Sequence, residues 1–162
     1  MKLARLAVVS ITSALAVTAL APATAGGNTC WDFKDADRAM AKKVNKARAN
    51  NDRVKLTLDP EMSRVARSHS KTMAKKASLY HTKNLGSKVT NWKSLGENVG
   101  YGSSVKQLHK MFMASSGHRT NILKSSYRYV GVGTTRKDGT LWVTVIFESK
   151  KNPGTSLSMP GC

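Results

Sequence analysis

The sequence predicts an α+β protein built as a three-layer α-β-α sandwich around a central, mainly antiparallel sheet. In three segments before residue 124, apolar residues recur every three or four positions, which is typical of amphipathic helices. Near the end of the chain, two runs rich in β-branched and aromatic residues flank Lys137-Asp138-Gly139, which indicates a hairpin. The second run is apolar on both faces, so we expect helices on both sides of the sheet.

Three helices are expected. The first covers residues 35–50, with an apolar stripe opposite a basic face. The second opens at Asp59-Pro60-Glu61, an N-cap, a first-turn proline and an acid, and runs to about Lys75. The third starts at Ser104, which forms a capping box with Gln107; Gly117 ends or kinks it, and a short helical turn follows to Leu123.

The rest of the chain contains loops and strands. Residues 77–102 are rich in Gly, Asn and Ser, so we expect loops with a short strand near residues 97–100. Strands are expected over residues 127–135 and 140–148. In the second strand, Trp142 and Ile146 face away from four other apolar residues, namely Leu141, Val143, Val145 and Phe147.

The first residues are typical of a signal peptide. Lys2 and Arg5 precede an apolar run, and Ala23-Thr24-Ala25 supplies the small residues that signal peptidase requires. We therefore expect a signal peptide over residues 1–25, a domain over 26–148 and an irregular arm over 149–162. The apolar run is too short and too often interrupted to span a bilayer, so no transmembrane segment is expected in the mature chain. The expected location is extracellular, with cell-wall association as a further expectation.

Basic residues dominate the composition, with 27 Lys and Arg against 9 Asp and Glu and a formal charge of +18. Removing Lys2 and Arg5 leaves +16 on the mature chain. Outside a cell, such a surface favours anionic cell-wall polymers or lipid headgroups as partners, and nucleic acid is not expected. Solubility alone is the alternative explanation for the charge. We expect a monomer.

The chain has two cysteines, Cys30 and Cys162. Since exported proteins keep their disulfides, we expect these two to pair. Two free thiols are the alternative.

Chemistry is expected at two of the four histidines. His69 lies on the apolar stripe of the second helix, where a core histidine bonded to backbone is expected, and His109 is expected on the surface. His81 and His118 lie at element ends, where side chains can converge on a cleft. Glu97, in the Gly-flanked stretch SLGENVGYG, could ligate metal, orient a histidine or act as a base. The alternative is that Glu97 bonds only to backbone in its own turn. Common protease, hydrolase and nucleotide-binding motifs are absent from the sequence.

Seven stretches follow one another between about Met40 and Glu148: NKARAN, LDPEMSRVARSHSKTMA, LYH, LGENVGYG, SSGHRTNIL, VGVG and WVTVIF. In this order they resemble the CAP superfamily, the SCP-like group of cysteine-rich secretory, antigen 5 and pathogenesis-related proteins, in its short bacterial form.

The resemblance implies an α-β-α sandwich with a cleft lined by two histidines and two acids, which in some members holds a divalent metal such as zinc. By position, His81 and His118 match the two histidines and Glu97 matches one acid. Ser115 occupies the place of the second acid, so a two-histidine metal site should bind less tightly here.

Three functions follow as hypotheses. The first is a secreted binding module that recognises an anionic or lipidic envelope component, because family members are reported to bind sterols and other lipids. The second is a zinc-dependent extracellular hydrolase of peptidase type, in which His81 and His118 hold the metal and Glu97 is catalytic. The third is an extracellular effector that acts on other proteins through exposed loops.

Overall fold

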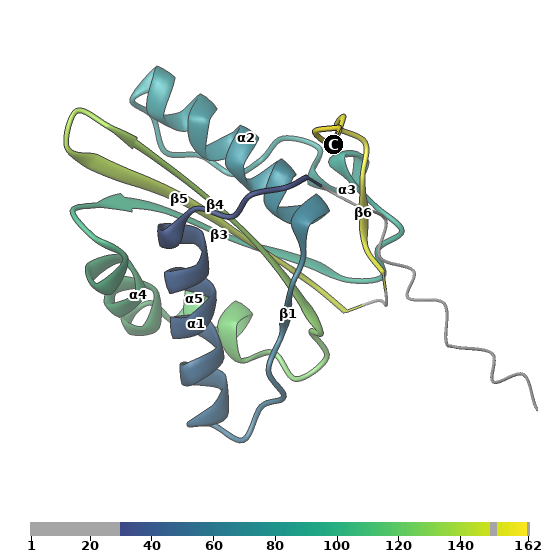
Figure 1. Cartoon of the computed structure of the whole chain (residues 1–162). Helices are drawn as coiled ribbons and strands as arrows, with labels where there is room; N and C mark the ends of the chain where they lie inside the picture. Colours follow the sequence, from purple (N-terminus) through teal and green to yellow (C-terminus); the bar gives the residue numbers. More distant parts are fainter. Residues whose placement is uncertain (1–29, 150–151, 162) are drawn as a thin grey trace, which may run out of the picture.

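A four-stranded sheet lies at the centre of the molecule, with strand order β1-β4-β5-β3 (Figure 1). The computed structural model describes residues 30–149 and 152–161, so the predicted signal peptide and Cys162 lie outside the described residues. The strands are β1 (Thr57–Leu58), β3 (Leu95–Gly102), β4 (Tyr129–Lys137) and β5 (Thr140–Glu148). Only β1 pairs in parallel, with β4, so the sheet is mainly antiparallel as predicted.

Helices cover both faces of this sheet, which confirms the three-layer sandwich (Figure 1). The helix α2 (Pro60–Lys76) packs on one face, and α1 (Asp35–Ala49), α4 (Val105–Ala114) and α5 (Ser116–Leu123) pack on the other. β5 supplies both cores, as its pattern predicted: Val143, Val145 and Phe147 contact the α1 side, and Ile146 contacts α2. Among the described residues, no helix is both long and apolar enough to cross a bilayer.

The contact between α2 and β4 depends on two glycines. A Cβ on Gly131 would overlap Met62, and one on Gly133 would overlap the backbone of Ala66 and Arg67. Both positions therefore let the helix lie directly on the strand.

The helix ends agree with the expected caps, with one correction. The Oδ1 atom of Asp59 accepts from the backbone N–H of Met62 at 2.8 Å, and Ser104 Oγ accepts from the N–H of Gln107 at 3.2 Å. The prediction that Gly117 ends or kinks the third helix is wrong. The break occurs at Ser115, whose extended backbone separates α4 from α5, and Gly117 lies inside α5.

The segment between α2 and α4 is more regular than expected. It contains α3 (Leu85–Lys88), β2 (Val89–Thr90) and all eight residues of β3, where only residues 97–100 were expected as strand. The C-terminal arm also contributes a short strand, β6 (Gly154–Thr155), which pairs antiparallel with β2.

Candidate functional site

Glu97 lies on the edge strand β3 and is held by three hydrogen bonds. His81 Nδ1 lies 2.7 Å from its Oε2 atom, which also accepts from the backbone N–H of Thr82 at 2.9 Å. The hydroxyl of Thr82 donates to Oε1. The carboxylate is almost fully buried, whereas the His81 side chain is 66% exposed. Glu97 therefore anchors the segment after α2 to the sheet and orients the His81 ring, with Nε2 as the nitrogen left for a ligand.

His118 lies at the start of α5, which is tied to β3 through the G-E-N motif. Asn98 Nδ2 donates to the carbonyl of His118 at 3.0 Å, and Asn121 Nδ2 donates to the carbonyl of Glu97 at 3.1 Å and to Asn98 Oδ1 at 2.9 Å. The His118 ring lies against Phe112, with centroids 4.9 Å apart. The two asparagines thus satisfy backbone carbonyls beside the candidate site.

Burial lowers the pKa of His118, and the positive charge of His81 lowers that pKa further. The two imidazoles are therefore close enough to repel each other when protonated. The lowered pKa favours the uncharged form of His118, which both donates and accepts a hydrogen bond.

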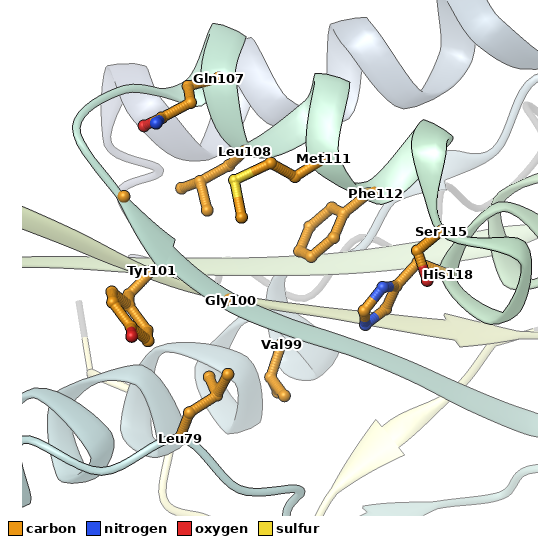
Figure 2. A pocket seen from close by; sticks show the side chains of 11 residues that line it. Leu79, Val99, Gly100, Tyr101, Gln107, Leu108, Met111, Phe112, Ser115 and His118 are labelled. Atoms are coloured by element: carbon orange, nitrogen blue, oxygen red, sulfur yellow. The ribbon is translucent and has the colours of Figure 1, made fainter.

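A groove of about 540 Å³ runs along the edge of β3 and ends at His118 (Figure 2). In Figure 2, side chains of α4 point toward β3 from one side, and Leu79 lies on the other. The lining is mainly apolar: Leu79, Val99, Gly100, Tyr101, Gly102, Gln107, Leu108, Met111, Phe112, Ser115 and His118. Glu97 lies two residues before Val99 on the same face of β3, so the His81–Glu97 pair adjoins this groove.

Three large apolar side chains are exposed at the groove: Met111, Tyr101 and Leu79, at 52%, 51% and 46%. Met111 lies one turn from Leu108 on α4, but only Leu108 and Phe112 of this helix are buried. Sequence reasoning missed this groove and also Thr82. Neither had a local signal, since the groove forms between segments distant in sequence and Thr82 is defined by its contact with Glu97.

The fit of a divalent metal to this site is partial. Ser115 lies at the His118 end of the groove and offers a hydroxyl where a carboxylate would be expected. The oxygens of Glu97 already accept bonds from His81 and Thr82. Within the described ranges, no three His, Cys, Asp or Glu side chains are placed to hold a metal ion. The remaining ligands would be two imidazoles, from His81 and His118.

The other two histidines lie outside this site. His69 is buried and its Nε2 lies 2.7 Å from the carbonyl of Tyr80, so the expected core role is confirmed. The expectation that His109 is a solvated surface residue is wrong. It is half-buried against α1, and burial, with the charge of Lys43, lowers its pKa.

Comparison with known proteins establishes the family. The model of the cysteine-rich secretory protein family, CAP, matches residues 41–147. The chain belongs to the CAP family. This confirms the resemblance drawn from the sequence motifs.

Within the CAP family, the chain is 32% identical over 136 residues to the uncharacterized protein YkwD of Bacillus subtilis (strain 168). The match covers 75% of this chain and 52% of YkwD, so the chain spans about half the length of that relative.

Two solved structures show the same fold. An extracellular protein containing an SCP domain from Bacillus anthracis str. Ames has a TM-score of 0.61 and 24% identity, over 70% of this chain and 40% of that one. An outer surface protein of Borrelia burgdorferi has a TM-score of 0.64 and 14% identity, over 74% of this chain and 96% of that one.

Proposed function

We propose that this CAP protein is a secreted module that binds an anionic or lipidic component of the cell envelope. The observation that carries the proposal is the apolar groove of about 540 Å³ that ends at His118, beside the His81–Glu97 pair. The extracellular and outer-surface proteins that share the fold are consistent with export.

The groove suits an amphiphile better than a purely polar ligand. Each methylene group that leaves water for an apolar wall contributes about 0.8 kcal/mol, so an acyl chain would supply most of the binding free energy. At the far end, the imidazoles of His81 and His118 offer hydrogen bonds to a polar headgroup. The cationic surface would add long-range attraction to anionic envelopes.

A substitution in the groove tests this proposal. Met111→Glu places a charge on the apolar wall, and because Met111 is 52% exposed, little stability should be lost. Titration with a fluorescent long-chain fatty acid should show binding weakened by about tenfold or more, since burial of a Met side chain contributes about 1.5–3 kcal/mol. Val54→Glu is the matched control, because Val54 is 63% exposed and does not line the groove. Equal affinity of all three proteins would refute a groove-bound chain.

The attraction of the cationic surface to an anionic envelope is tested separately. Retention of the mature protein on phosphatidylglycerol vesicles, or on purified cell walls, should fall steeply as salt rises from about 50 mM to 500 mM. Retention that does not change with salt would contradict the anionic component of the proposal.

The zinc-dependent hydrolase is a second candidate, favoured by one observation. The Glu97 carboxylate fixes the His81 ring, as carboxylates commonly do for metal-bound histidines. A bound metal would supply Lewis acidity next to the groove, held by His81 and His118, while Glu97 would orient His81. Elemental analysis of the purified protein should find about one metal per chain in the wild type and none in His118→Ala; metal-free wild type removes this candidate.

A further inference from the structure

We propose that the exposed face of α2, with Trp31 and the C-terminal arm beside it, binds a linear polymer that carries repeated oxyanion groups, phosphate or carboxylate. The inference rests on the proposed function and assigns the binding of the anionic envelope component to this one surface. The basic residues of this face are Arg64, Arg67, Lys71 and Lys75, and none of them lines the apolar groove.

The first observation is a row of cations along α2. Arg64, Arg67, Lys71 and Lys75 are spaced three, four and four residues apart, so they follow one face of the helix over about 16 Å. The only acid on α2 is Glu61, in its first turn. Like charges four residues apart destabilise a helix, and Lys71 with Lys75 is such a pair. An anionic polymer lying along the row would relieve this repulsion.

The second observation is a hollow of about 580 Å³ next to this row. It is lined by Trp31, Arg64, Arg67, Ser68, Lys71, Ser158, Met159 and Pro160, and no carboxylate is among these residues. Two N–H groups of lining residues, Trp31 Nε1 and Arg67 Nε, are buried and have no acceptor in the described part of the chain. The accessible polar side chains of the lining are Arg64, Ser68, Lys71 and Ser158, and they supply donors and hydroxyls, which is the chemistry that an oxyanion requires.

Internal contacts hold the floor of the hollow in place. Arg67 Nη2 donates to Asp37 Oδ2 at 2.5 Å and to the carbonyl of Asp32 at 2.8 Å, and its guanidinium lies 4.0 Å from the centroid of a Trp31 ring. The charge of Arg67 is thus largely neutralised by Asp37. Its contribution is to fix Trp31 against α2.

The basic side chains that remain available to bind a ligand lie along α2. Among the described residues, Arg64, Lys71 and Lys75 form no ion pair within 4.0 Å. Arg64 Nε donates to the carbonyl of Ser158 at 3.0 Å, which positions the arm and keeps the positive charge. Since these charges are spread along the helix, they match a chain with several anionic groups better than a single ion.

A pair of matched charge reversals tests the site. Lys71→Glu with Lys75→Glu changes two exposed lysines four residues apart, the second in the last turn of α2. Lys42→Glu with Lys46→Glu changes two exposed lysines with the same spacing, the second in the last turn of α1. Both double variants alter the net charge equally, so they separate a local site from the overall charge.

The probes are inorganic polyphosphate and polyglutamate, titrated against the mature protein in about 100 mM salt. We expect at least one polymer to bind the α2 variant about tenfold more weakly than wild type and the α1 variant less than threefold more weakly. The polymer whose binding is weakened in the α2 variant identifies the recognised group as phosphate or carboxylate. Equal weakening in both variants, or binding of neither polymer to wild type, would overturn the site. The α2 variant should still bind fatty acid like wild type, so a failure here and a failure of the groove remain distinct.

Discussion

At the scale of single residues, Glu97 shows how a predicted functional group also serves the fold. The sequence left open whether this carboxylate would face a cleft or bond locally. In the structure it bonds to His81 and to both donors of Thr82, so it orients a cleft histidine and ties the segment after α2 to β3.

The Thr82 hydroxyl should therefore contribute to stability. Thr82→Val keeps the side-chain shape and leaves a buried oxygen of Glu97 without this donor, so we expect a loss of about 1–3 kcal/mol in the free energy of unfolding. Urea denaturation measures the loss. Thr72→Val is the control, because Thr72 is exposed and its hydroxyl donates to the carbonyl of Ser68 within α2. A loss no larger than that of the control would contradict the structural role of the Thr82–Glu97 bond.

Asp59 should make the free energy of unfolding depend on pH. Burial raises its pKa from 3.8 to about 6, although the bond from Met62 favours the ionised form. Because the folded state holds the proton more tightly than the unfolded chain, the free energy of unfolding falls as pH rises from about 4 to about 6. Above about pH 6, Asp59 is ionised in the folded state, and the free energy of unfolding is lowered by the full cost of burying that charge.

Asp59→Asn should remove this dependence while keeping an oxygen for the cap. We expect the variant to match wild type near pH 4 and to exceed it in stability at pH 7, by on the order of 1–3 kcal/mol. Urea denaturation of both proteins at the two pH values tests this. A difference between them that does not change with pH would refute the raised pKa.

At the scale of elements, long periodic segments were predictable and short or glycine-rich ones were not. The helices α1 and α2 agree with the patterns because each buries one apolar stripe. The hairpin of β4 and β5 agrees because β5 is apolar on both faces and is buried between the two helix layers. β3 contains glycines at positions 96, 100 and 102, which resemble loop residues in the sequence. The segment is a strand because all eight of its residues pair with β5. The glycines suit positions that neighbours crowd: a Cβ on Gly96 would overlap the Tyr127 hydroxyl, and one on Gly100 would press on Phe112. Such tertiary contacts have no local signature.

The contact between α2 and β4 should be intolerant of even one methyl group. Gly133→Ala would drive a Cβ into the backbone of Arg67, so we expect a loss on the order of 3 kcal/mol or more. Gly117→Ala is the opposite case: it lies within α5 with no atom within 4 Å of the added Cβ, and should stabilise by about 0.5–1 kcal/mol. Thermal melts of the two variants should therefore shift in opposite directions. A Gly133→Ala melt equal to wild type would contradict this packing.

At the scale of the whole molecule, the surface is more cationic than the composition alone suggests. Three of the nine acids, Asp37, Glu97 and Glu148, are buried in structural roles. Among the described residues, most Lys and Arg side chains remain at the surface, apart from Arg48, which is fully buried and donates to the carbonyls of Ile122 and Lys124. The exposed charges are therefore mainly positive, as contact with an anionic envelope would require.

A bond between Cys30 and Cys162 would link the segment before α1 to the C-terminal arm. Cys162 lies outside the described residues, but residues close to each cysteine, Trp31 and Pro160, line the same hollow beside α2. A bond closing so long a loop should contribute about 5 kcal/mol in the chain-entropy model, less any strain. Alkylation of unreduced mature protein should leave its mass unchanged, and reduction should then allow two alkyl groups and lower the melting temperature. Two alkyl groups added without reduction would show free thiols. The arm would then be held without a covalent link, by contacts that include β6, the Arg64–Ser158 bond and the packing of Leu157.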